Sequence, residues 1–394
     1  MTKQELLERI KGKLIISCQA LETEPLYDPE RTLMDRMALA AKEAGSPMIR
    51  TCGVRDILAI KEKTGLPVIG LIKIQYEGFD RYITPTAKEV EELRKAGAEV
   101  IAIDCTDQKR GDGSRIEDFM REMREKYPDQ IFMADISTFE EGVRAEKLGF
   151  DLVSTTMSGY TPQSAQGAGP DYEIVRRLSE TLSIPVIGEG KLHAPEEASF
   201  MLRQGAYAVV VGGAITRPLE IAARFQKAVT QKRASVEEIL EKMILAAEGN
   251  QHDIEHFLKV HAYARTIGML EGLDQETRFI LETAAVIHDI AVPFCRARYG
   301  LADGRLQEKE SEPLVRDFLK GTGLSEDETE RIVYLICHHH TIDPVAGIDH
   351  RILLEADFLV NAVEGHYQEE QIRHAKERVF RTKTGLTLLE ALFQ

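Results

Sequence analysis

The sequence predicts an α/β domain of the (β/α)₈ barrel type (a TIM barrel), followed by an all-α domain. Three observations support this expectation. The chain has 394 residues, more than the roughly 100–200 residues of a usual single domain. Residues 14–213 contain eight short apolar or β-branched runs, separated by amphipathic segments. After about residue 229 these runs give way to long segments in which apolar residues recur with a helical period.

The eight short runs are the candidate barrel strands. Many of the segments between them begin at Thr, Ser or Pro and end at Gly, as helices do. A doubly wound open sheet is the competing fold, but it usually has a glycine-rich turn after its first strand. The first run here is followed by QALETEPLYD, which has no glycine, so the barrel is favoured. The runs cover residues 14–18, 47–51, 67–73, 99–105, 131–135, 151–156, 185–190 and 208–213.

The predicted domains are 1–230 for the barrel and 237–394 for the helical part, with a linker near 230–236. A net charge of −15 disfavours nucleic acid or an anionic membrane as the main partner. No apolar run approaches the roughly 18 residues of a membrane span. Five cysteines without a C-x-x-C pair indicate reduced thiols and a cytoplasmic protein. Homo-oligomerisation stays open.

Polar residues end most of the eight runs, at the edge where barrel enzymes place their active sites. Solvent-facing strand ends explain any one of them, but they explain poorly a ring that combines a lysine, an arginine and three carboxylates. We therefore expect a functional site there. The ring consists of Gln19, Arg50, Lys73, Asp104, Asp135, Thr155 or Thr156, Glu189, and Gly212 with Gly213.

Two features of the ring narrow its chemistry. Glycines end the seventh and eighth runs, where barrels often bind phosphate through backbone N–H groups, and Arg217 follows shortly after. Lys73 and Glu189 are the candidate acid/base groups. Lys73 could also form a Schiff base, or it could simply pair with Asp104. Arg50 on the neighbouring run would lower the pKa of Lys73, whereas Asp104 or Asp135 would raise it.

The segments SCQALETEPL, GLIK, YITPT, MADIST, GFDLVSTTMSGYTP, IGEGKLHAPEEA and VVGGAITRP resemble the N-acetylmannosamine-6-phosphate 2-epimerases of sialic acid catabolism, over residues 8–229. The resemblance implies interconversion of N-acetylmannosamine 6-phosphate and N-acetylglucosamine 6-phosphate without metal or redox cofactor. It makes Lys73 the proton-transfer lysine at C2 and Glu189 its partner carboxylate. The implied sugar ligands are Gln19, Arg50 and Asp135, and the implied phosphate ligands are Gly190, Gly212, Gly213 and Arg217. Lys191, where the family often has arginine, is a departure.

The helical half carries most of the histidines, in the order His256, His288-Asp289 and Asp357. With AAVIHDI and LLEADFLVNA around them, these residues resemble the H…HD…D pattern of HD-domain metal-dependent phosphohydrolases, over about residues 250–365. Two imidazoles and two carboxylates suit Mn²⁺, Mg²⁺, Fe²⁺ or Zn²⁺. The resemblance implies an unknown phosphorylated substrate.

Three points about the helical half stay open at this stage. In the run His338-His339-His340, the first or second histidine could bind a second metal or the substrate phosphate, or the run could only end a helix. His256 is preferred as a ligand over its neighbours His252 and His261. A non-catalytic module that senses a nucleotide or sugar phosphate is the alternative to a hydrolase.

Overall fold

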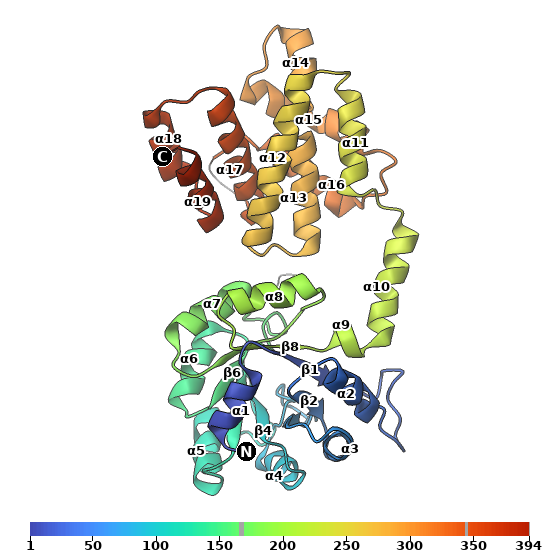
Figure 1. Ribbon diagram of the computed structural model, residues 1–394, viewed down its shortest axis with the longest axis vertical. Helices are drawn as coiled ribbons and strands as arrows, with labels where there is room; N and C mark the ends of the chain where they lie inside the picture. Colours follow the sequence, from blue (N-terminus) through green and yellow to red (C-terminus); the bar gives the residue numbers. More distant parts are fainter. Residues whose placement is uncertain (165–168, 343–345, 394) are drawn as a thin grey trace. The chain divides into compact units, whose positions relative to one another are not determined.

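The computed structural model describes residues 1–164, 169–342 and 346–393 and separates into two compact units, Met1–Phe225 and Gln226–Gln394 (Figure 1). Helix α10 (Pro218–Gln231) crosses the boundary, and α11 begins at Val236. Residues 232–235 between these two helices are not helical.

The first unit is a closed barrel of eight parallel strands, in which each strand pairs with its neighbours in the sequence and β8 pairs with β1. This confirms the predicted barrel. Each predicted run contains a strand or overlaps most of one, because β-branched and apolar residues suit a strand that is buried on both faces. The strands are β1 (Leu14–Cys18), β2 (Ile49–Cys52), β3 (Val68–Leu71), β4 (Val100–Asp104), β5 (Ile131–Asp135), β6 (Leu152–Ser154), β7 (Val186–Gly188) and β8 (Ala208–Val211).

Helices connect successive strands, and several begin with a capping box. Thr86 and Thr138 each accept a hydrogen bond from the first turn of a helix, while a glutamate three residues later accepts one from the backbone of the cap. The helices of this unit are α1 (Lys3–Ile10), α2 (Met34–Glu43), α3 (Val54–Thr64), α4 (Ala87–Lys95), α5 (Ile116–Lys126), α6 (Phe139–Lys147), α7 (Tyr172–Thr181), α8 (Pro195–Arg203), α9 (Gly213–Thr216) and most of α10.

The barrel unit has two apolar cores. The larger lies between the strands and the surrounding helices and includes Ile49, Ile101 and Val209. The smaller fills the inside of the barrel, where Ile15 and Met133 pack with Leu6 of α1 and other apolar side chains. Because side chains alternate between the two faces of a strand, every second residue of a strand faces the inside of the barrel.

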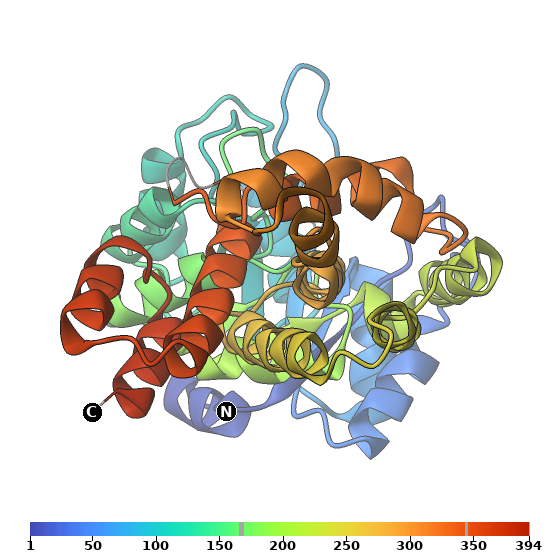
Figure 2. The ribbon, with the colours of Figure 1, turned by 90° about the horizontal axis from the view of Figure 1, so that it is seen from above.

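The second unit is all-α, as predicted, and α12, α13 and α17 pack against one another at its centre (Figures 1 and 2). Its core contains Phe257, Ile287, Leu335 and Leu353 among many apolar residues. The remaining helices surround this centre. The helices are α11 (Val236–Ala246), α12 (Gln251–Leu270), α13 (Gln275–Ile287), α14 (Val292–Tyr299), α15 (Gly304–Leu319), α16 (Glu326–Cys337), α17 (Ile348–Glu364), α18 (Glu369–Arg378) and α19 (Lys383–Leu392).

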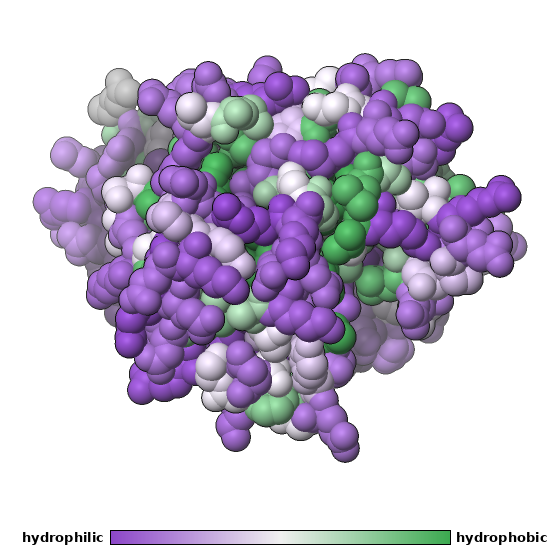
Figure 3. Space-filling view, turned by 90° about the horizontal axis from the view of Figure 1, so that it is seen from below, coloured by the Kyte–Doolittle hydropathy of each residue, from purple (hydrophilic) through white to green (hydrophobic). Residues whose placement is uncertain are grey.

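The surface reflects the high content of charged residues. The face in Figure 3 is mainly hydrophilic, and its hydrophobic side chains form only small patches. Among the described residues, none of the helices is both long enough and apolar enough to span a membrane.

Candidate active site and candidate metal centre

Because side chains alternate along a strand, those of the polar strand-end residues point into the barrel. Ile15, Met48 and Met133 belong to the inner core, so the residues two positions further along each strand face the same way. These positions are Ser17, Arg50 and Asp135. The same rule applied to the other strands selects Lys73, Asp104, Ser154, Glu189 and Gly212.

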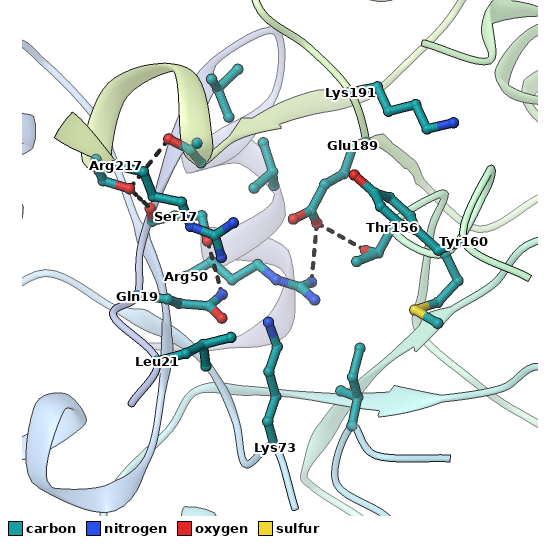
Figure 4. A pocket seen from close by; sticks show the side chains of 18 of the residues that line it. Ser17, Gln19, Leu21, Arg50, Lys73, Thr156, Tyr160, Glu189, Lys191 and Arg217 are labelled. Atoms are coloured by element: carbon teal, nitrogen blue, oxygen red, sulfur yellow. Dashed lines mark hydrogen bonds and ion pairs between the residues drawn. The ribbon is translucent and has the colours of Figure 1, made fainter. Parts of the chain in front are cut away.

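A cavity of about 550 Å³ lies at this end of the barrel, a volume typical of small-molecule sites. Figure 4 shows the side chains of Lys73 and Glu189 entering it from different walls, with the Arg50 guanidinium between them. The predicted site residues that line the cavity are Gln19, Arg50, Lys73, Glu189, Gly190, Gly212, Gly213 and Arg217. Thr156, Tyr160 and Lys191 also line it.

Arg50 holds two carboxylates beneath and beside the cavity. Its guanidinium donates to both oxygens of Asp135, at 3.1 and 2.7 Å, and lies 3.2 Å from Glu189 Oε2. Asp135 is completely buried and lies outside the set of described residues that line the cavity. Asp135 contacts Arg50 and Thr156, and its role as a sugar ligand stays a prediction.

Lys73 follows β3 and is mostly buried. Burial lowers the pKa of Lys73, and the positive charges of Arg50 and Arg217 act in the same direction. Among the described residues no ion pair joins Lys73 to Asp104, whose carboxylate instead lies 3.8 Å from Arg81 and accepts hydrogen bonds from Thr106. A neutral lysine amine can accept a proton.

Three glycines and Arg217 also line the cavity and suit an anion. Gly190 has a φ of +106°, which glycine adopts readily. Gly212 and Gly213 lead into α9, and Arg217 lies beyond it, paired with Glu24 at 3.0 Å and Glu220 at 2.9 Å.

Ser17, which lines the cavity, and Ser154 at the end of β6 were not singled out from the sequence, and the choice between Thr155 and Thr156 was left open. Gln19 donates to Ser17 Oγ at 2.9 Å, while its buried Oε1 has no partner among the described residues. Thr156 and Ser154 both contact the Glu189 carboxylate, whereas Thr155 bonds only to the backbone of Glu189. Strand alternation is the signal that would have selected Ser17, Ser154 and Thr156.

The helical unit brings the H…HD…D residues together. His256 lies on α12, His288 ends α13 and is followed by Asp289, and Asp357 lies on α17. The Nε2 atoms of both histidines lie 3.4 Å from Asp357 Oδ1. They lie 3.5 and 3.7 Å from Asp289 Oδ2.

Each imidazole is fixed by its other nitrogen. His288 Nδ1 lies 2.9 Å from the Ala285 carbonyl oxygen, and His256 Nδ1 lies 2.9 Å from Glu364 Oε2. Such contacts direct the Nε2 lone pair toward a metal. Although burial lowers the pKa of His256, the Asp357 and Glu364 carboxylates raise it to about 9. A proton at His256 thus compensates the acidic cluster in the absence of an ion.

His339 extends the cluster on the other side of Asp289. Its Nδ1 lies 2.6 Å from the Ile336 carbonyl oxygen, and its Nε2 lies 3.6 Å from Asp289 Oδ1. That buried Nε2 has no hydrogen-bond partner among the described residues. One ligand atom each of Asp289, His339 and His340 lie within 4.8 Å of one another. Asp289 therefore faces histidines with both of its oxygens, an arrangement that fits divalent cations.

Three histidines considered in the sequence analysis lie outside the cluster. His338 stacks on Tyr334, with ring centroids 4.2 Å apart, and His261 lies 3.0 Å from Glu282. His252 is exposed. Sequence reasoning missed Glu364, although its spacing of seven residues from Asp357 places both on one face of α17.

These geometries define the class of each unit: a (β/α)₈ barrel with an acid/base cavity, and an all-α unit with a His/Asp cluster. The chain belongs to the family described as "Putative N-acetylmannosamine-6-phosphate epimerase", whose sequence profile matches residues 34–231. The profile of the HD domain matches residues 253–378. Each of the two structural units is therefore matched by the sequence profile of a known family.

Several relatives resemble the barrel over nearly their whole length. A protein from Caldanaerobacter subterraneus subsp. tengcongensis is 50% identical over 233 residues, which are 59% of this chain and 98% of the relative. One from Clostridium perfringens is 52% identical over 220 residues, 56% and 98% of the two chains. Both carry the name "Putative N-acetylmannosamine-6-phosphate 2-epimerase". The solved N-acetylmannosamine-6-phosphate 2-epimerase from Clostridium perfringens is 51% identical, with a TM-score of 0.54, and the match covers 57% of this chain and 96% of that one.

Proposed function

We propose that the barrel interconverts N-acetylmannosamine 6-phosphate and N-acetylglucosamine 6-phosphate, as its relatives' names describe. The observation that supports this most is that one cavity is lined by Lys73 and Glu189 and also by Arg217 and three glycines. The first pair suits proton transfer, and the second feature suits the sugar phosphate. The resemblance favours a role in sialic acid and amino sugar catabolism, and the cysteines without a C-x-x-C pair favour the cytoplasm.

The reaction requires a proton to leave C2 and to return on the opposite face. That proton is acidic only when C1 is an open-chain aldehyde, so the site must favour ring opening and stabilise an enolate. Lys73, whose pKa is lowered by burial, is the base at C2. Glu189 is its partner carboxylate and assists ring opening. Gln19 and Arg50 hold the sugar, and Asp135 acts through Arg50.

Proton NMR in D₂O tests this proposal. N-acetylmannosamine 6-phosphate incubated with the purified protein should yield N-acetylglucosamine 6-phosphate with deuterium at C2. An unchanged substrate whose C2 proton does not exchange would contradict the proposal. Lys73 could instead serve a Schiff-base aldolase, in which case borohydride with an aldehyde or ketone substrate would trap a covalent adduct.

For the helical domain we propose a divalent metal centre with which the domain hydrolyses an unidentified phosphate ester. His256, His288, Asp289 and Asp357 would hold one ion, and Asp289 with His339 would hold a second. A bound ion supplies an activated water and polarises the phosphoryl oxygen. The inward, unpartnered Nε2 of His339 supports this donor set.

Metal analysis and a panel of phosphate esters test the second activity. We expect bound Mn²⁺, Mg²⁺, Fe²⁺ or Zn²⁺ and metal-dependent release of phosphate from at least one ester. Bound metal without hydrolysis across a broad panel would favour the alternative, a ligand-sensing module. A protein that binds no divalent ion would contradict both.

A further inference from the structure

The hydroxyl group of Thr156 lies between two carboxylates. Thr156 Oγ1 is 2.9 Å from Asp135 Oδ1 and 2.9 Å from Glu189 Oε2. Ser154 Oγ is 2.8 Å from Thr156 Oγ1 and 3.3 Å from the same glutamate oxygen. Figure 4 shows the link between Thr156 and Glu189 on the wall of the cavity.

Counting protons restricts how this group of oxygens can be arranged. A threonine hydroxyl carries one proton and can donate one hydrogen bond. If both carboxylates were ionised, Thr156 could donate to only one of them, and the other would face an oxygen lone pair at 2.9 Å. Both contacts are satisfied when the pair holds one proton, with Glu189 donating to Thr156 and Thr156 donating to Asp135.

The surrounding charges favour this order. Arg50 donates hydrogen bonds to both oxygens of Asp135, whereas its contact with Glu189 is an ion pair at 3.2 Å, so Asp135 is the better stabilised anion. Lys73 and Tyr160 also face Glu189. Burial raises the pKa of Glu189, and Asp135 acts in the same direction, whereas Arg50 and Lys73 lower it. A Thr156 hydroxyl that donates to ionised Glu189 would also lower this pKa, so the direction of that hydrogen bond decides where the proton lies.

We propose that Thr156 is a positioning residue that assigns the one proton of the Asp135–Glu189 pair to Glu189. It does so by accepting a hydrogen bond from the Glu189 carboxyl group while donating its own proton to Asp135. Under the proposed function, on which the use of this proton rests, the partner of Lys73 begins the reaction as a proton donor.

Infrared difference spectroscopy of the full-length protein reads this proton without substrate, so its result is independent of whether the barrel is an epimerase. Native protein at neutral pH should show a protonated-carboxyl C=O band that Glu189→Gln abolishes. In Thr156→Val the titration midpoint of this band should fall by about one pH unit, a tenfold change in the ionisation constant. Thr156→Ser, which keeps the hydroxyl, should restore the native midpoint.

Three results would overturn the proposal: a native protein with no such band, an unchanged midpoint in Thr156→Val, or a midpoint that rises. A rise would mean that Thr156 donates to an ionised Glu189. Circular dichroism checks that each variant folds, and Thr156→Ala replaces the valine variant if valine disturbs the strand end. The native-minus-Glu189→Gln spectrum tests the location of the proton even if neither Thr156 variant folds.

Discussion

Replacing Glu364 with glutamine tests whether the helical unit is built for a metal. Glu364 Oε2 lies 2.9 Å from His256 Nδ1, so the carboxylate orients the imidazole and increases its basicity. Losing such a support typically weakens metal binding 10- to 100-fold, which is about 1.4–2.7 kcal/mol. Glu364 is also 3.2 Å from Lys259, and this ammonium already takes part of its charge. We therefore expect a loss near the lower limit, about tenfold.

Titration of chelator-treated, full-length protein with Mn²⁺ in a calorimeter measures this loss. Lys259→Met is the matched control, because it removes the other partner of Glu364 and leaves the contact with His256 in place. Its affinity should equal or slightly exceed the native value. The reasoning is refuted if Glu364→Gln binds Mn²⁺ as tightly as native protein, or if both variants lose affinity equally.

Three further predictions concern single residues of the two sites. His339→Ala should lower the number of bound ions by one per chain, whereas His338→Ala should not; elemental analysis decides, and equal losses would contradict the distinction. Glu189→Gln should raise the thermal stability of the barrel. Because burial raises the pKa of Glu189 in the folded protein, the unfolded chain loses this proton at a lower pH than the folded chain does. Folding therefore costs free energy that grows as the pH rises above the unfolded pKa and disappears as the pH falls below it. The difference in melting temperature between Glu189→Gln and native protein should therefore grow from pH 5 to pH 8. A difference that stays constant over this range would contradict this explanation. Lys73→Met should slow epimerisation by at least about 10²-fold and suppress deuterium uptake at C2, and turnover near the native rate would exclude Lys73 as the base.

The barrel was predictable because its strands carry a local signal. A strand such as residues 131–135, buried on both faces, is almost continuously apolar until Asp135, and eight such runs in order leave few other folds. The strand-end ring followed from the same pattern. Which of Thr155 and Thr156 faces the cavity could also have been read from alternation, since Leu152 and Ser154 point inward with Thr156.

Asp104 shows where strand position is insufficient. It ends β4 and lies on the inward side, yet Thr106 and Arg81 hold its carboxylate away from the cavity. Arg81 comes from the loop after β3, and the packing of that loop has no periodic signal in the sequence. In the helical unit, likewise, the order H…HD…D predicted which residues meet, but the contact of Glu364 with His256 depends on how α12 and α17 pack.

The two sites handle buried negative charge with different partners, and this difference separates their chemistry. Asp135 and Glu189 meet a guanidinium, which only donates hydrogen bonds and has no lone pair for a cation, and hydroxyl groups, which can donate or accept. Excess charge is best relieved there by a proton, which suits acid/base catalysis. Asp289 and Asp357 instead meet three imidazoles whose Nδ1 atoms are engaged elsewhere. Their Nε2 atoms lie next to the carboxylates. Under the proposed function, a divalent cation would displace the proton on His256 and relieve the charge of this cluster.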